Sequence, residues 1–119
     1  MTASADQLVQ RHCKPCEGGV AAYTAEAARD QAQKLAGWVL SDDGKKICKK
    51  WTVNNFLDGI DFFNRVSEVA EAEQHHPDLH LEGYRRIRIE LSTHAIDGLS
   101  ENDFILAAKI DRLPVKVKS

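Results

Sequence analysis

Histidines are concentrated in one part of the chain. Four of the five lie between residues 71 and 94, namely His75, His76, His80 and His94. The unperturbed pKa of histidine, roughly 6.5, lets this side chain accept and release protons near neutral pH. The cluster therefore predicts either proton-transfer chemistry or a metal site.

His75 and His76 are followed directly by Pro77. The residue before a proline avoids helical angles, so a preceding helix is expected to end here, with both histidines at or just past its C-terminus. At that place the helix dipole favours a protonated imidazole. Adjacent side chains point in different directions, so we expect different roles for the two. A rigid pair suits proton transfer, which requires fixed distances.

His94 follows a strand-like run, and we expect its partner to be Asp103, nine residues further on across a turn at Gly98. A carboxylate beside an imidazole orients the ring and stabilises its protonated form. Each residue also has a plainer interpretation: His94 as a strand-end surface residue, Asp103 as a helix cap, and His80 as a surface residue on an edge strand.

A metal-free acid–base site is favoured over a metal site. The four clustered histidines could in principle supply three zinc ligands. Their spacing matches no standard zinc signature, however, and the chain contains no HExxH motif. We therefore expect no metal at this site.

The three cysteines, Cys13, Cys16 and Cys48, form an odd and low count. This argues against a disulfide framework and fits a reducing compartment. Cys13 and Cys16, with His12 beside them, could bind zinc or form a redox pair. No second CxxC completes four ligands, and no βαβ pattern supports a thioredoxin-like site. A loop in an N-terminal arm is the favoured interpretation.

Residues 1–22 show no sustained periodicity and are predicted to form a mobile or loosely docked arm, with a single domain over 23–119. Apolar spacing predicts helices over 24–36, 55–74 and 100–113, capped by Thr24, Asn55 and Ser100. Strands are predicted over 38–40 and 47–53, joined by a turn at Asp43-Gly44, and over 78–81 and 84–93. In the long helix, the stripe expected to face the core is Phe56, Ile60, Phe63 and Ala70, widened by Phe62, Val66 and Val69.

The order of these elements is helix, strand, strand, helix, strand, strand, helix. It predicts an α+β fold of two layers, in which three helices cover one face of an antiparallel four-stranded sheet. The other face is left for solvent or for a partner subunit.

Length and composition set outer limits on function. The 119 residues form one domain, and their 43% apolar and 29% charged content is ordinary for a soluble globular protein. A formal net charge of −2 gives no broad reason to bind nucleic acid or an anionic membrane. No apolar run reaches the roughly 18–20 residues of a membrane helix, and the N-terminus lacks a signal-peptide core. A cytoplasmic location is therefore expected.

One spaced motif contains Glu71, His75-His76-Pro77, Tyr84, Ser92-Thr93-His94 and Asp103. It resembles the motif of the pterin-4a-carbinolamine dehydratases, which implies a reaction with no metal and no organic cofactor. The resemblance spans roughly residues 22–113, and the order of helices and strands also resembles the family fold. Two departures concern the mouth of the pocket: Leu79 stands where many members carry Trp, and the segment before Tyr84 is the longer of two family variants.

The resemblance implies a hydro-lyase that dehydrates a 4a-hydroxytetrahydropterin to quinonoid dihydropterin in tetrahydrobiopterin recycling. It implies that His75 and His94 are the proton-transfer pair and that His76 shares this role or holds the pterin. Asp103 would support His94, and Glu71 would place the ring or tune His75. By the same resemblance, the pterin would be lined by Pro77, Thr93, Ala95 and Ile96.

Two alternatives remain open. Animal relatives also act as dimerisation partners of a homeodomain transcription factor, which implies a protein-binding module without direct DNA contact. The chain could also serve another pterin pathway, such as folate or molybdenum-cofactor metabolism. The resemblance further implies a homodimer or a homotetramer and does not choose between them.

Overall fold

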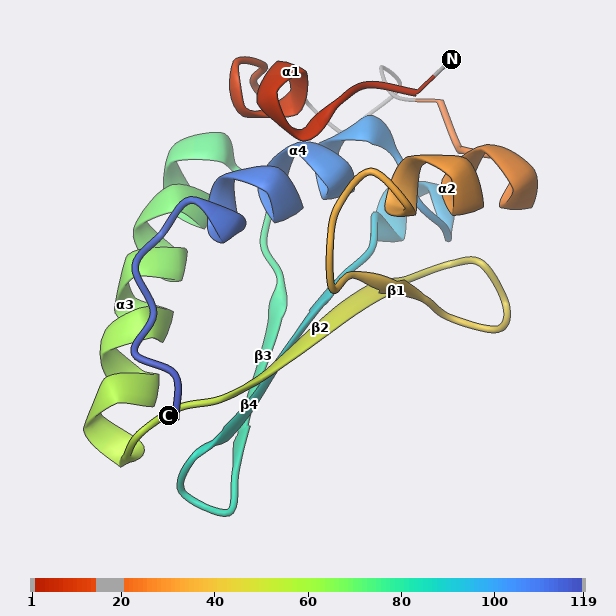
Figure 1. The fold of residues 1–119 in the computed structure, drawn as a ribbon. Coiled ribbons are helices and arrows are strands. Elements are labelled where there is room, and N and C mark those ends of the chain that lie inside the picture. The colour runs from red at the N-terminus through yellow and green to blue at the C-terminus, as the bar shows by residue number, and fades with distance from the viewer. Residues whose placement is uncertain (1, 15–20, 119) are drawn as a thin grey trace.

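The computed structural model describes residues 2–14 and 21–118 (Figure 1). Its helices and strands follow the predicted order, with one short additional helix in front, so the predicted α+β class is confirmed. In the described part of the chain, no helix is long and apolar enough to cross a membrane. The elements are α1 (Ala5–Val9), α2 (Ala25–Ala32), β1 (Val39–Leu40), β2 (Ile47–Thr52), α3 (Phe56–Glu73), β3 (Asp78–Glu82), β4 (Arg86–Leu91), a 3₁₀ turn (His94–Ile96) and α4 (Glu101–Asp111).

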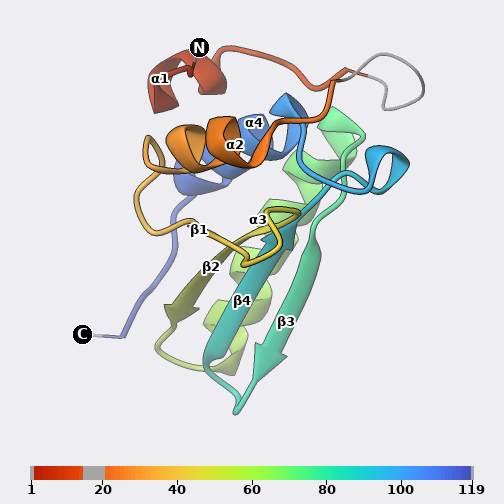
Figure 2. The same ribbon diagram turned by 90° about the vertical axis from the view of Figure 1, so that its right-hand side faces the viewer.

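The four strands form one antiparallel sheet in the order β1-β2-β4-β3. Ile87, Ile89 and Leu91 of the inner strand β4 are all buried, as their alternation predicts. This apolar face packs against α3, which lies behind the sheet in Figure 2, and it shares one core with buried residues of α4. Arg88 and Glu90 alternate with them and lie on the opposite face.

Helix α3 is positioned differently from the prediction. Asn55 caps it as expected, because its Oδ1 accepts the Asp58 N–H at 2.9 Å. Phe56 and Ile60, however, are 49% and 37% exposed, and the predicted stripe is therefore wrong at these two positions. Gly59 faces the sheet instead, where an added Cβ would lie 3.1 Å from Leu81 Cδ1. This close approach rotates the buried stripe to Gly59, Phe62, Val66 and Ala70.

Helix α2 begins as predicted, with the Thr24 hydroxyl accepting the Ala27 N–H at 3.1 Å. It ends at Ala32, four residues earlier than predicted. A series of turns follows, because the chain must change direction to bury both Leu35 and Trp38. The hairpin between β1 and β2 then turns at Gly44, which has φ +72°, in agreement with the predicted Asp43-Gly44 turn.

The N-terminal arm is not loosely docked over residues 2–14, which corrects the prediction. Its short helix α1 packs on the outer side of α4 (Figure 1) and buries Leu8 completely. Ala3 is also buried, and its N–H donates to Gln31 Oε1 at 2.9 Å. A helix this short carries too few apolar residues to show a period, so periodicity could not predict it. Cys16 lies outside the described residues.

Candidate active site

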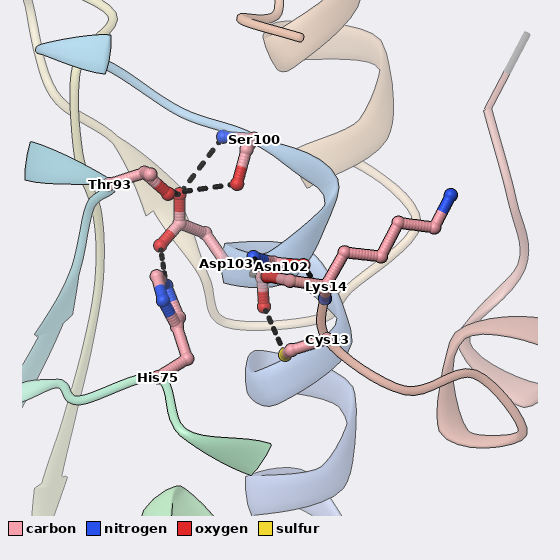
Figure 3. A network of polar contacts seen from close by, with 7 residues as sticks. All are labelled: Cys13, Lys14, His75, Thr93, Ser100, Asn102 and Asp103. Carbon is pink, nitrogen blue, oxygen red and sulfur yellow. Dashed lines mark hydrogen bonds and ion pairs between the residues drawn. The ribbon is translucent and has the colours of Figure 1, made fainter. Parts of the chain in front are cut away.

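His75 is placed by the end of α3. Gln74 takes the left-handed conformation, with φ 53°, and ends the helix three residues before Pro77. The His75 N–H then donates to the Ala70 carbonyl at 3.2 Å, which turns the ring inward. The His75 residue is 5% exposed, and its Nε2 lies 2.6 Å from Asp103 Oδ1 (Figure 3). The structure therefore forms a buried histidine–carboxylate pair.

Asp103 lies in the first turn of α4 and is completely buried. Its second oxygen, Oδ2, accepts the Thr93 hydroxyl at 2.7 Å and the Ser100 N–H at 3.0 Å. The predicted capping box of Ser100 and Asp103 is thus present. Both oxygens of Asp103 are therefore engaged by neighbouring groups, Oδ1 by His75 Nε2 and Oδ2 by Thr93 and Ser100.

His94 is not the partner of Asp103, and this part of the prediction is wrong. Strand β4 ends at Leu91, and Thr93 then pairs with Gly98 through a 2.8 Å bond from the Thr93 N–H to the Gly98 carbonyl. Side chains alternate along extended backbone, so the buried Thr93 faces Asp103 and the next residue, His94, is exposed. The carboxylate that we assigned to His94 belongs to His75.

His76 has a different environment from His75, as expected for adjacent residues. Its side chain is 60% exposed, and its Nε2 pairs with Glu71 Oε2 on the preceding turn of α3. An exposed pair of this kind contributes little to stability, because water competes for both side chains. The pair of Glu71 and His76 therefore offers hydrogen-bonding groups at the surface, and His76 directly follows His75 in the chain.

His94 lines a shallow cavity of about 250 Å³ at the end of β4. The hairpin between β1 and β2 supplies its other wall, where Lys45 Nζ lies 2.8 Å from Asp97 Oδ2. Ala95 is exposed and Ile96 half-buried in the adjacent 3₁₀ turn, and Pro77 is half-buried. The lining residues are Asp43, Lys45, Lys46, Ser92, Thr93, His94, Asp97 and Gly98.

The remaining histidines lie outside the buried pair. His80 is on β3, with Nε2 3.5 Å from Glu90 Oε1. His12 in the arm has Nδ1 2.9 Å from Glu73 Oε2. Over residues 2–14 and 21–118, no three or more His, Cys, Asp or Glu side chains are arranged to hold a metal ion.

Glu73 is a functional candidate that the sequence did not single out. Burial alone would raise the pKa of its carboxyl, but hydrogen bonds from the Cys13 N–H, His12 and Lys109 outweigh burial and lower the pKa. Glu73 is two residues before His75. Only the position of Glu73 at the predicted end of the helix could have drawn attention to it.

The fold and the site define the class of protein: a small α+β protein whose sheet and helices hold a histidine–carboxylate pair beside further histidines. The pterin 4 alpha carbinolamine dehydratase family matches residues 21–113, and the chain belongs to this family. The predicted family and its enzyme class, a hydro-lyase, are thereby confirmed.

Relatives with high identity carry the same description. The chain is 50% identical over 112 residues to "Pterin-4-alpha-carbinolamine dehydratase 2, mitochondrial" of Arabidopsis thaliana, an alignment that covers 92% of this chain and 60% of that protein. It is 46% identical to a putative pterin-4-alpha-carbinolamine dehydratase of Halorhodospira halophila, covering 89% and 96% of the two chains.

A solved structure agrees with the fold. It is described as a transcriptional coactivator/pterin dehydratase from Brucella melitensis, and it superimposes with a TM-score of 0.71 at 25% identity. The match covers 76% of this chain and 96% of that one.

Proposed function

We propose that this protein dehydrates a 4a-hydroxytetrahydropterin to quinonoid dihydropterin by histidine acid–base catalysis. The observation that carries the proposal is the buried pair of His75 and Asp103, in a chain that belongs to the pterin 4 alpha carbinolamine dehydratase family. Tetrahydrobiopterin recycling is the pathway that we assign to it.

The reaction needs two proton transfers. The hydroxyl on C4a leaves as water once a general acid has protonated it, and the C4a–O bond breaks. A general base takes the proton from N5, and the electron pair of the N5–H bond forms the double bond between C4a and N5. One group gains a proton and the other loses one, so acid–base catalysis suffices without an organic cofactor or a metal.

His75 suits one of these transfers. In this proposal His75 Nε2 donates to Asp103, and this contact fixes the orientation of the ring for proton transfer. Burial of the pair keeps its geometry fixed, which proton transfer requires. We assign the second transfer to His94, whose exposed ring lines the neighbouring cavity.

The other predicted residues hold the substrate in this proposal. The exposed pair of Glu71 and His76 offers hydrogen bonds to the pterin ring, and His76 can share in proton transfer. Backbone groups of Pro77, Ala95 and Ile96 line the ring. The backbone of Thr93 is paired with that of Gly98. We therefore assign Thr93 an indirect role in the site, through the hydrogen bond that its hydroxyl donates to Asp103.

The test is dehydration of freshly generated 4a-hydroxytetrahydropterin, followed by ultraviolet absorbance with the uncatalysed background subtracted. We expect a rate that a chelator does not change, and that falls by about 100-fold or more in His75→Ala and in His94→Ala. His80→Ala, on the outer face of the sheet, is the control and keeps the rate. Full rates in both His75→Ala and His94→Ala would exclude this mechanism.

A protein-binding function is the second candidate. Phe56, Leu57 and Ile60 are exposed at the start of α3, and the Brucella structure is described as a transcriptional coactivator as well as a dehydratase. If the protein shows no rate above background, and retains a transcription factor through this helix face, the binding function replaces the enzymatic one. A dehydratase of folate or molybdenum-cofactor metabolism would use the same residues and is separated by comparing pterin substrates.

For the assembly and location we keep the predictions from the sequence. We propose a homodimer or homotetramer, which sedimentation at several protein concentrations tests. We propose a cytoplasmic location, although the Arabidopsis relative is named as a mitochondrial protein. Fractionation of cells that produce the protein decides between the two compartments.

A further inference from the structure

The N-terminal segment contacts both elements that carry the buried pair. On the α3 side, the Cys13 N–H donates to Glu73 Oε1 at 2.7 Å, and His12 Nδ1 lies 2.9 Å from Glu73 Oε2. Lys109 of α4 also reaches Glu73, with 3.3 Å between Nζ and Oε2. Glu73 precedes His75 by only two residues in the chain.

On the α4 side, the segment binds Asn102, which is 1% exposed and directly precedes Asp103. The Lys14 N–H donates to Asn102 Oδ1 at 2.9 Å, and Asn102 Nδ2 donates to the Lys14 carbonyl at 2.8 Å. Cys13 Sγ lies 3.6 Å from the Asn102 carbonyl (Figure 3). An amide paired in both directions with one backbone residue has a fixed orientation.

The same segment is anchored independently at its beginning. The Ala3 N–H donates to Gln31 Oε1 at 2.9 Å, and Gln31 Nε2 donates to the Ala3 carbonyl at 2.8 Å. Between these contacts and Asn102, Leu8 of α1 is completely buried. Residues 2–14 are therefore held at both ends, and they link α2, α3 and α4.

Cys13 contributes contacts and not thiol chemistry. Burial, followed by the nearby Glu73 carboxylate, raises the pKa of the Cys13 thiol to about 12. The thiolate is the reactive form of cysteine, and a thiol with such a pKa is almost entirely protonated at neutral pH.

We propose that the N-terminal segment is part of the active site, because through Asn102 and Glu73 it sets the relative position of His75 and Asp103. Asn102 and Glu73 are positioning residues that act through the neighbouring pair. The proposal rests on the role given above to this pair in proton transfer.

Within residues 2–14 and 21–118, three segments bring charged groups to the surroundings of the pair. Asp103 of α4 faces the His75 ring, and Glu73 of α3 is compensated by Lys109 and by His12 of the arm. Thr93 and Ser100, on the other side of Asp103, are neutral. Replacement of Asn102 leaves all of these charges in place, so its effect reports on position.

The experiment compares Asn102→Ala with Gln31→Ala. Each variant removes a buried amide that both donates to and accepts from the backbone of the arm, but Gln31 lies on α2, away from the pair. We expect similar losses of stability in urea unfolding. We expect kcat to fall by about tenfold or more in Asn102→Ala, since small misplacements of catalytic groups are costly, and to stay within about twofold in Gln31→Ala.

A second readout does not depend on activity. A proton in a short hydrogen bond gives a downfield proton resonance, and His75 Nε2–H should give one because of its 2.6 Å bond to Asp103. In Asn102→Ala we expect this resonance to shift upfield and to exchange faster with water, and in Gln31→Ala to stay unchanged. Identical resonances and identical kcat in the two variants would overturn the proposal.

The two readouts also separate this proposal from the proposed function. If the unmodified protein dehydrates no pterin, the function fails, while the resonance still decides whether the arm positions the pair. Should Asn102→Ala fail to fold, Glu73→Ala removes the contacts at the α3 end and leaves Asn102 in place. We expect the same loss of kcat and the same change in the resonance. If neither is seen, the arm does not position the pair of His75 and Asp103.

Discussion

At the scale of single residues, Asp103 serves two purposes. Its carboxylate completes the N-terminal cap of α4 through the Ser100 N–H and holds His75 Nε2 through its other oxygen. A capping pattern in a sequence can therefore hide a residue of an active site. The two purposes can be separated by substitutions that keep the size of the side chain.

Asp103→Asn keeps the shape but replaces an acceptor by an amide that can donate to His75 Nε2. We expect the ring to take the other tautomer and the dehydration rate to fall by about 100-fold or more, as for other histidines that lose an orienting carboxylate. Initial rates with the background subtracted measure the effect, and circular dichroism checks the fold. A rate within about twofold of the unmodified protein would mean that Asp103 only caps the helix.

The Thr93 hydroxyl supports Asp103 from the strand side. Thr93→Val keeps the volume but removes the donor to Asp103 Oδ2, so we expect a loss of about 1–3 kcal/mol in the free energy of unfolding. Thr93→Ser keeps the hydroxyl and is the matched control, with a smaller loss from the missing methyl group. Urea unfolding of the unmodified protein and the two variants measures both losses of stability. Equal stability of Thr93→Val and the unmodified protein would contradict this account.

At the scale of elements, the position of α3 depends on Gly59. A Cβ here would lie 3.1 Å from Leu81 Cδ1 and 3.4 Å from Ile87 Cγ2, so the helix approaches the sheet as closely as a glycine allows. We expect Gly59→Val to lower the free energy of unfolding by about 1–3 kcal/mol through overpacking. Thermal unfolding and urea unfolding measure the change.

Glu68→Val is the control on the exposed face of α3, and it introduces the same β-branched residue without a clash. Its cost is expected to stay below about 1 kcal/mol, from helix propensity alone. Equal effects at the two positions would show that the close approach at Gly59 does not limit packing.

At the scale of the whole molecule, Glu73 joins the arm, α3 and α4 in one ionic cluster. Its pKa is lowered in the folded protein, so it contributes stability above its ordinary pKa of 4.5, and this contribution is lost as the pH falls through the folded value. We expect Glu73→Gln to be less stable than the unmodified protein at pH 7, and the difference to shrink below about pH 4.5.

Urea unfolding of both proteins from pH 7 down to about pH 3 tests this. Other carboxyl groups titrate in both proteins and cancel in the difference, so only the contribution of Glu73 remains. A difference that is constant over the whole range would show that the ionised form of Glu73 gives the fold no net stability.

The sequence by itself determined the order of the helices and strands from α2 onward, and the antiparallel four-stranded sheet. Helix caps at Thr24, Asn55 and Ser100, and alternation along Ile87, Ile89 and Leu91, are local signals that the structure reproduces. They could be predicted because each depends on residues within a few positions of one another. The family also followed from the sequence, since its motif is a pattern of spacings.

Only the tertiary structure decided which side chains meet. His75 and Asp103 are 28 residues apart, and the pairing of Thr93 with Gly98, which turns His94 outward, depends on how the chain crosses between β4 and α4. The rotated stripe of α3 depends on space at Gly59, and the docking of the arm depends on Leu8, Asn102 and Gln31 together. Local sequence fixes backbone preferences, but contacts over long separations depend on the packing of elements against one another.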